Sequence, residues 1–516
     1  MKFKATLIAA ALLAANTASA DLTVKITGAT AFRASAVNAI KNTMTFPADA
    51  GGIDYGYAFN STTLEASANA IFVGTMAAFP GQVVTVKCTW SGSVAGIRAI
   101  SGNTNGTAVN VKFLALNPST SANGTIYALS ATGTAGVNAD NLDDNSQADF
   151  AFADNTQSST IYTNNTLDSR NVGVVPFTFV ASRDMPAAVT NVTSQLFQSL
   201  YSTGRASAAL FTNNPTDASD QVGGTMIYAL GRDPFSGTRV VVMSETGLGT
   251  GSAVNQWTVA AGTGTSPNIE AGAVSPTSAD TTTDSLNPVL AGNNGISGAN
   301  MADWLRYKTT SINDTAALVS TKAAFIGYMS ETDADRAVNG TASSVNGITN
   351  VGARYLSYNG VNAFGGKLYT SNNATTTIGS AVVSNIVTTG LVVGQFVRST
   401  SGQLDTDNVI VSINANGTEV TLSKPALASA TATANFQASN VLPASIWSGA
   451  YTLWGYELFL KRASLTTGDK FTFFNNLADR IHDVDFFYAG LSEASLRVSR
   501  SEDGGIVTSK YIFPEE

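Results

Sequence analysis

Thiol and imidazole groups are almost absent from this chain of 516 residues, which has one cysteine, Cys88, and one histidine, His482. A single cysteine can form neither a disulfide within the chain nor a thiolate metal cluster. A single histidine excludes the HExxH zinc motif, and a Ser-His-Asp triad would have to use His482 without a GxSxG motif to accompany it. We therefore expect no metal, no cofactor and no enzymatic activity.

Charge is scarce as well. Charged residues make up 12% of the chain, against about 25% in an average soluble protein. The formal net charge is −8, and no basic run is present that could neutralise the backbone of a nucleic acid. Beyond residue 20, no segment approaches the roughly 18 consecutive apolar residues of a membrane span. The composition thus argues against a nucleic-acid-binding or membrane-spanning protein.

Residues 1–20 have the features of a secretory signal peptide. Lys2 and Lys4 form a positive start, residues 5–15 are apolar, and the small residues at 18–20 (ASA) fit a cleavage site. We expect the mature chain to begin at Asp21, where no cysteine could carry a lipid anchor. The sequence predicts a periplasmic or secreted protein.

The most informative feature present is a set of three loops that combine glycine with small hydroxylated residues. They cover residues 27–32 (TGATAF), 91–96 (SGSVAG) and 232–239 (RDPFSGTR). Glycine lets a ligand approach backbone N–H groups closely, and such N–H groups can cradle an anion. Arg232, four residues before Ser236, adds a positive charge. Together the loops predict a site that holds a small oxyanion from several sides.

Each loop follows a predicted strand, and a further buried strand ends at the carboxylate of Asp154. These strands are expected at residues 22–26, 83–87, 226–230 and 149–154. Helical patterns alternate with the strands, which predicts an α/β fold with largely parallel sheets. Ligands of such folds lie beyond the carboxyl ends of the strands, which is where the loops and Asp154 would lie.

Three other segments complete the interpretation. Residues 45–80 read as irregular, and an apolar strand at 172–180 is expected to be broken by Pro176. Composition changes near Gly365, and residues 366–440 show short alternating strands that we interpret as an inserted small all-β module. The expected organisation is a signal peptide at 1–20, lobe 1 at 21–165, lobe 2 at 166–348, and a return to lobe 1 at 349–365 and 441–516.

These residues resemble the phosphate-binding protein family of ABC importers, which has a two-lobed type 2 periplasmic-binding fold. The first loop (GAT), the second loop (GSxxG) and the strand ending in Asp154 are similar to the family's segments. The third loop matches the family's RxxxSGT pattern in residues and spacing. Further similar segments lie at 174–177, 191–196, 324–328 and 449–457. The resemblance covers most of residues 21–365 and 441–490.

The resemblance implies a role for each loop residue. The hydroxyl groups that would donate hydrogen bonds to the anion belong to Thr30, Ser93, Ser236 and Thr238. The backbone N–H groups of Ala31 and Gly237 would also donate, and Arg232 would pair with the charge. Asp154 would accept the proton of a hydrogen phosphate. Because sulfate carries no proton at neutral pH, Asp154 would repel it and so select phosphate.

The chain departs from the family in two places. The family has an acidic residue two positions after the arginine, whereas this chain has Pro234 there and Asp233 beside it. Ala31 replaces a larger residue, although only its N–H group is needed. These departures leave open which oxyanion is bound and how tightly.

We expect a monomeric, exported solute-binding protein that captures inorganic phosphate or a similar oxyanion by lobe closure, for an ABC permease. Two alternatives stay open. The β module and the low-charge loops would also suit a surface or matrix structural protein that reuses this scaffold. An exported hydrolase would need His482, which stands at the end of a predicted helix, where a cation complements the helix dipole.

Overall fold

A computed structural model gives the structure of the protein. It describes residues 21–45, 55–58, 64–114, 127–129, 144–183, 185–252, 254–260, 268–270, 298–306, 312–313, 322–340, 353–399, 402–405, 407–482 and 490–510. The predicted signal peptide lies outside the described residues. None of the described helices is long and apolar enough to cross a membrane.

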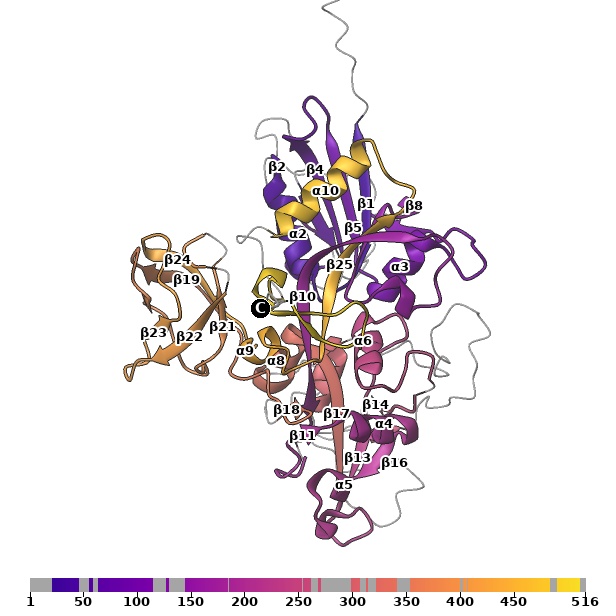
Figure 1. The fold of residues 1–516 in the computed structure, drawn as a ribbon, viewed down its shortest axis with the longest axis vertical. Coiled ribbons are helices and arrows are strands. Elements are labelled where there is room, and N and C mark those ends of the chain that lie inside the picture. The colour runs from indigo at the N-terminus through magenta and orange to yellow at the C-terminus, as the bar shows by residue number, and fades with distance from the viewer. Residues whose placement is uncertain are drawn as a thin grey trace, which may run out of the picture.

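A large sheet runs through the molecule and carries helices on its faces (Figure 1). In its upper part the strand order is β4, β5, β1, β9, β25 and β10. β1 is parallel to β5 and β9, whereas β25 is antiparallel to β9 and β10. The bounds are β1 Leu22–Gly28, β4 Asn69–Met76, β5 Val84–Thr89, β9 Phe150–Ala153, β10 Leu167–Ala181 and β25 Trp454–Arg462.

Helices cover both faces of this part of the sheet because successive strand residues point to opposite sides. On one face, Phe150 and Phe152 of β9 lie in one apolar cluster with side chains of α2 (Arg33–Thr43) and α10 (Asp469–His482). On the other face, Ala151 and Ala153 lie in a second cluster with α3 (Ser93–Ser101). The second loop is thereby placed at the N-terminus of α3, above the end of β9.

The long strand β10 joins the two parts of the molecule. Its residues 167–176 pair with β25, and its residues 177–181 pair with β17 (Lys322–Ser330) and β18 (Arg354–Tyr358). The prediction that Pro176 breaks this strand is wrong. Pro176 pairs with Trp454 at the last position before β10 changes partner, and a proline is tolerated best where a ladder ends.

The lower part of the sheet has the order β12, β13, β17 and β10, with β13 parallel to β17. Helix α4 begins as predicted, since the Thr193 hydroxyl accepts a hydrogen bond from the Leu196 N–H at 3.1 Å. The apolar run 240–243 is helical and belongs to α6. The bounds are β12 Arg205–Ser207, β13 Thr225–Ala229, α4 Ser194–Thr203, α6 Gly237–Glu245, α7 Gly298–Leu305 and α8 Glu331–Asn339.

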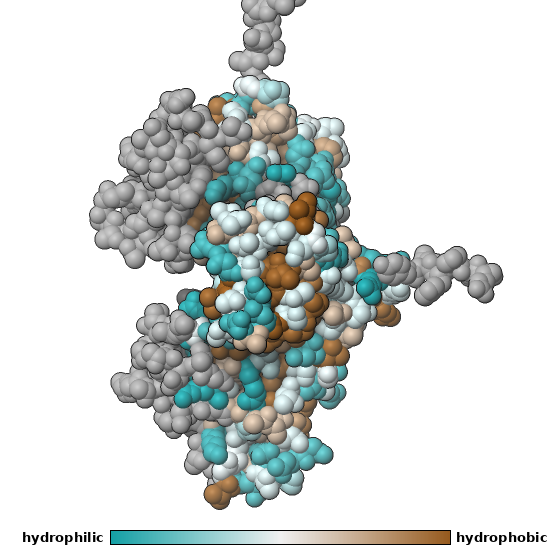
Figure 2. All heavy atoms as spheres, turned by 90° about the vertical axis from the view of Figure 1, so that its left-hand side faces the viewer, coloured by the Kyte–Doolittle hydropathy of each residue, from teal (hydrophilic) through white to brown (hydrophobic). Residues whose placement is uncertain are grey.

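The predicted β module is a closed barrel that stands to one side of the sheet (Figure 1). Its strand order is β19, β20, β23, β22, β21 and β24, and its core is the apolar cluster that contains Val397, Ile410 and Phe436. Apolar residues also reach its outer surface (Figure 2), among them Val387 and Val393. The bounds are β19 Tyr369–Thr376, β20 Val382–Ser384, β21 Phe396–Arg398, β22 Asn408–Ile413, β23 Glu419–Leu422 and β24 Ala430–Ala438.

The fold class predicted from the sequence, α/β with an inserted all-β module, is confirmed. The prediction that residues 45–80 are irregular is wrong in part, because β4 is a buried strand of the main sheet. The lobe ranges stay a prediction. The remaining short elements are β2 Met44–Thr45, β3 Tyr55–Ala58, β6 Val111–Phe113, β7 Tyr127–Leu129, β8 Asp144–Ser146, β11 Asn191–Val192, α5 Ala209–Thr212, β14 Thr258–Ala260, β15 Asn268–Glu270, β16 Ile312–Asn313, α9 Ala444–Trp447, β26 Val498–Ser499 and β27 Thr508–Ser509.

Candidate oxyanion site

The first two loops are fastened to each other and to β9. The carbonyl of Gly28 accepts a hydrogen bond from the Gly92 N–H at 2.9 Å, and the Ala29 N–H donates to the Phe152 carbonyl at 2.8 Å. Gly28 has φ of +116°, and a Cβ there would collide with the Phe152 backbone, so only glycine fits this crossing of strands. Thr30 follows on the exposed side of the first loop.

Ser93 and Asp154 form a buried pair where the second loop meets the end of β9. Ser93 is the first residue of α3, and its hydroxyl is in short hydrogen-bond contact with the Asp154 carboxylate. Each residue is 2% exposed. Burial raises the pKa of Asp154, while the Ser93 hydrogen bond and the charge of Arg232 oppose that rise. The predicted hydroxyl donor and the predicted proton acceptor are therefore in direct contact with each other.

The third loop lies directly on this pair. The Val94 N–H donates to the Phe235 carbonyl at 3.1 Å, which joins the start of α3 to the third loop. A Cβ on Gly237 would collide with the Asp154 carboxylate and would lie 2.5 Å from the Ser93 hydroxyl oxygen. Segments from the upper and lower parts of the sheet thus converge at Ser93, Asp154 and Gly237.

Ser236 and Gly237 begin helix α6 with their polar groups facing inward. Ser236 is the N-cap, and its hydroxyl accepts a hydrogen bond from the Arg239 N–H at 3.3 Å. The hydroxyl proton of Ser236 remains to be donated, since a hydroxyl is both donor and acceptor. Ser236 and Thr238 are each 3% exposed. The N-terminal N–H groups and the dipole of α6 favour a negative charge at this end.

Arg232 has a carboxylate neighbour that the sequence did not indicate. Asp233 is occupied in the loop itself, since its side chain accepts from the Phe235 N–H at 2.9 Å. Asp333, in the first turn of α8, interacts electrostatically with Arg232 and with Arg33 of α2. Burial raises the pKa of Asp333, and these cations oppose the rise. Asp333 therefore gives Arg232 an acidic neighbour from a different element of the fold.

Arg33 connects this cluster to the upper part of the sheet. It is the first residue of α2, and its side chain donates to the Glu65 carbonyl at 2.8 Å. Burial lowers the pKa of Arg33 to about 10, and the charge of Asp333 opposes that decrease. Arg33 of the upper part and Arg232 of the lower part therefore both interact electrostatically with Asp333, beside the converging loops.

Arg239 places a second positive charge beneath the third loop. Its side chain is 1% exposed, and one amino group donates to the Arg232 carbonyl at 2.7 Å. Its Nε and its other amino group have no hydrogen-bond partner among the described residues. Burial lowers the pKa of Arg239, and the electrostatic interactions with Tyr328 and Asp233 oppose that decrease. The guanidinium thus fixes the loop backbone from inside and adds positive potential to it.

The structure brings several of the predicted residues together. Ser93, Asp154 and Gly237 are in contact, and Ser236 and Thr238 flank Gly237. Arg232 lies close enough to act on the charge of Asp154. The first loop reaches the second through Gly28 and through the hydroxyl groups of Thr27 and Ser91, which lie 2.9 Å apart, and no described contact joins Thr30 or Ala31 to the others. Sequence reasoning missed Asp333 and Arg239, although the second arginine of the 232–239 loop was a local signal for Arg239.

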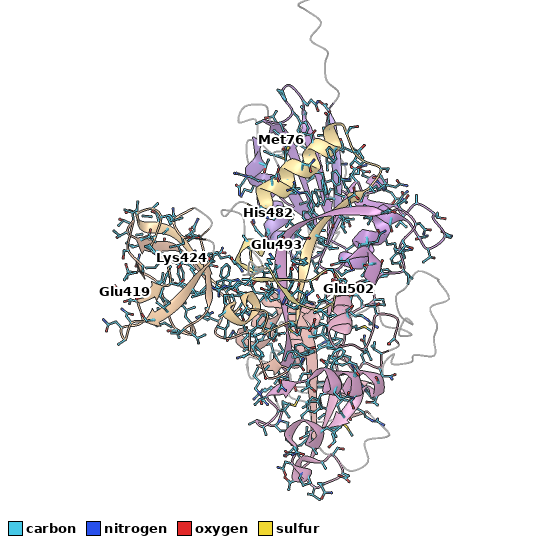
Figure 3. The ribbon with its side chains drawn as sticks, viewed as in Figure 1. Met76, Glu419, Lys424, His482, Glu493 and Glu502 are labelled. Atoms are coloured by element: carbon cyan, nitrogen blue, oxygen red, sulfur yellow. The ribbon has the colours of Figure 1, made fainter. Side chains whose placement is uncertain are left out.

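The histidine and the cysteine, which hydrolysis or thiol chemistry would need, do not lie among the converging loops. His482 is exposed at the end of α10 (Figure 3), in the last turn where its charge complements the dipole. Cys88 is buried in β5, and burial raises the pKa of its thiol well above its usual range. Within the described ranges, no cluster of three or more His, Cys, Asp or Glu side chains is placed to hold a metal ion.

No protein-family model and no curated protein matches this chain. Several solved structures are similar to it, among them the following three. A Clostridium perfringens protein with bound phosphate, provisionally named a phosphate ABC transporter substrate-binding protein, has 10% identity and a TM-score of 0.32, over 89% of this chain and 93% of its own. An ABC-type phosphate transport receptor from Vibrio cholerae has 12% identity and a TM-score of 0.31, over 89% and 93%.

The third is described as a possible phosphate binding protein from Planctomyces limnophilus, with 11% identity and a TM-score of 0.31, over 92% of this chain and 95% of its own. Similarity at this level is too weak to assign a ligand. The function of this chain must therefore be inferred from its own residues.

Proposed function

We propose that this chain is an exported solute-binding protein that captures inorganic phosphate, or a close oxyanion, between two lobes for an ABC importer. The observation that carries the proposal is the convergence of Ser93, Asp154 and Gly237 from both parts of the sheet, beside the charge of Arg232. In the proposed cycle the lobes open, the anion enters between the loops, and closure surrounds it.

The charge balance of these residues supports an anion. Arg232 contributes a positive charge near Asp154, and Arg239 contributes a second one from beneath the loop. The N-termini of α3 and α6 add their dipoles. A buried anion must be matched by many charge-assisted hydrogen bonds, and hydroxyl and N–H donors supply them without adding net charge. In the bound state Ser93 would donate to the anion instead of to Asp154.

Asp154 gives the proposed site its selectivity. A carboxylate among donors is repulsive to a fully ionised anion but can accept a hydrogen bond from a protonated one. Hydrogen phosphate has such a proton at neutral pH, whereas sulfate does not. The burial of Asp154 strengthens this discrimination, because interactions between charges are stronger away from water.

Calorimetric titration of the ligand-stripped mature protein with phosphate and with sulfate tests the proposal. We expect heat of binding with phosphate and none with sulfate. Arg232→Ala leaves the bound charge without its partner, which costs about 3–5 kcal/mol and lowers affinity by more than about a hundredfold. Arg170→Ala is the matched control, because Arg170 forms an exposed ion pair with Asp479 at 2.6 Å.

Asp154→Asn tests the selectivity. The amide is neutral and can donate to sulfate, so the difference between phosphate and sulfate should narrow. An unchanged difference would remove Asp154 from the site. A wild-type protein that binds neither anion would contradict the whole proposal.

A further inference from the structure

Glu457 is a buried carboxyl that the proposed site has not used. It lies in β25, between β9 and β10, and its exposure is 0%. On the β10 side it faces Gly173. On the β9 side, the register ends with Leu458 opposite Ala153, and its extension by one position sets Glu457 opposite Asp154, the residue that follows β9. The two carboxyl groups are therefore neighbours across the strands.

The alternation of side chains along the two strands directs both residues toward one face of the sheet, while the Asp154 carboxylate, beyond the end of β9, reaches Ser93 at the start of α3. Phe152 and Phe459 form the pair two residues away, and their rings stack with centroids 4.5 Å apart. Because side chains alternate along a strand, Asp154 follows Phe152 and Glu457 follows Phe459 on that face. Opposed residues have Cβ atoms about 4.5–5.5 Å apart, and like charges at that separation are destabilising.

The two carboxyl groups differ in their partners. Asp154 has the Ser93 hydroxyl and the charge of Arg232. Neither carboxylate oxygen of Glu457 has a hydrogen-bond partner in the part of the chain that the structure describes. Burial and then the charge of Asp154 raise the pKa of Glu457 well above its usual value. Ionisation without donors would be very costly, so Glu457 is the member of the pair that keeps a proton.

Among the described residues, the elements packed on this face bring aromatic rings to it, from Phe32, Phe473 and Phe474. Charged side chains of the neighbouring elements interact elsewhere, in the pairs Arg33 with Asp333, Lys470 with Asp149, Asp479 with Arg170, and Lys461 with Asp168. Asp503 and Arg232 act on Asp154. Asp154 is thus the described charge that acts directly on Glu457.

We propose, on the basis of the function proposed above, that Glu457 is a specificity-determining residue of the oxyanion site: a neutral, proton-bearing carboxyl that leaves Asp154 as the single ionised acceptor. A neutral Glu457 adds no negative charge, so Asp154 can stay ionised and accept the proton of the ligand. If Glu457 were ionised, one of two things would follow. Either both carboxylates would be negative and repel the anion, or Asp154 would take up a proton and could no longer accept the proton of the ligand.

Glu457→Gln keeps the shape of the side chain and removes its titration. The folded wild type holds a proton on Glu457 that the unfolded chain loses above about pH 4.3, so the wild type loses stability as pH rises through and beyond that value. We expect the Tm of Glu457→Gln, relative to the wild type, to increase from about pH 5 to about pH 9 in phosphate-free buffer. Equal pH slopes would overturn the inference whether or not phosphate binds.

Phosphate titration of the same two proteins gives the second measurement. We expect similar affinities near neutral pH, and at about pH 9 a several-fold weaker binding by the wild type than by Glu457→Gln. Equal affinities at the higher pH would overturn the role in specificity. If neither protein binds phosphate, the proposed function fails, while the Tm comparison still decides whether Glu457 carries the proton.

Glu457→Met is the second variant, for use if the glutamine amide is not accommodated. Methionine has a similar volume and needs no hydrogen-bond partner in a dry environment. It should show the same relative gain in Tm with rising pH. A methionine variant whose Tm follows the pH profile of the wild type would likewise overturn the inference.

Discussion

Gly237 lies at a close approach between the two parts of the molecule. It has no side chain between the start of α6 and the carboxylate of Asp154, and a Cβ there would also crowd the Ser93 side chain. The backbone of Gly237 therefore lies beside both the Ser93 hydroxyl and the Asp154 carboxylate. Glycine is required here by close approach and not by a positive φ angle.

We predict that Gly237→Ala weakens both folding and binding. The added methyl group must push α6 away from Asp154, and overpacking of this kind costs about 1–3 kcal/mol. The free energy of unfolding from urea denaturation and the phosphate affinity should both fall. Gly251→Ala is the matched control, because no atom lies within 4 Å of a Cβ at Gly251. A fully stable Gly237→Ala that binds phosphate normally would contradict this packing.

At the residue level, the sequence indicates candidate site residues where the information is local. The RxxxSGT spacing pointed to Ser236 and Gly237 as donors, although the helix that they begin was not predicted, and the end of a buried strand pointed to Asp154. Asp333 and Glu457 could not be found in this way. The first reaches Arg232 only through the packing of α8, and the second faces Asp154 only through the register of two strands remote in sequence.

At the scale of elements, helix α8 holds the barrel in place. Glu331, its first residue, forms a buried ion pair with Arg398 of β21 at 3.2 Å and accepts from the Gly490 N–H at 3.2 Å. Asp335 of α8 accepts from the Leu368 N–H at 2.8 Å, just before the barrel begins. The same helix carries Asp333 beside Arg232. The barrel is therefore attached to the element that faces the proposed site.

We predict that the barrel can be removed without loss of phosphate binding. Its two connections lie side by side, since Gln395 donates to the carbonyls of Lys367 and Ser439 at 3.0 and 2.7 Å. A short glycine linker can replace residues 368–438, with Glu331→Gln added because Arg398 is lost and an unpaired buried carboxylate is costly. Calorimetry should give the wild-type affinity. Lost affinity in a folded protein would assign the barrel a part in the site.

Element-level prediction failed where tertiary contacts overrule local signals. The strand β4 is buried between β3 and β5 although its surroundings in sequence look irregular. In the barrel, the sequence of β19 (YTSNNATT) is too polar to predict a strand, and the strand forms because it pairs along much of its length with β24. Pro176 was expected to interrupt β10, but the strand exchanges one partner for another at that point.

At the scale of the whole molecule, the C-terminal segment 490–510 fastens the upper and lower parts to each other. Arg500 pairs with Glu245 at the end of α6 at 2.8 Å. Asp503 accepts hydrogen bonds from the hydroxyls of Thr156 and Ser159, just after β9, at 2.8 and 2.6 Å. Figure 3 marks the neighbouring Glu502, which is exposed on this segment. The segment thus favours the arrangement in which the three loops meet.

We predict that loosening this segment weakens phosphate binding without touching the site. Thr156→Val with Ser159→Ala removes both hydroxyl donors to Asp503 but keeps its charge, which also acts on Asp154. Hydrogen bonds to a charged group contribute about 1.5–3 kcal/mol each. These two hydrogen bonds are expected in the closed arrangement and not in the open one. Their loss then lowers the fraction of closed molecules and raises the apparent Kd for phosphate by at least about tenfold.

Small-angle scattering distinguishes this explanation from damage to the site. The ligand-free double variant should have a larger radius of gyration than the wild type, and saturating phosphate should bring the two to the same value, because the closed state is still reachable. Ser158→Ala is the control, since that exposed hydroxyl contacts Thr156 and not Asp503. A weaker affinity with an unchanged ligand-free radius would mean that the segment acts on the loops directly and not through closure of the lobes.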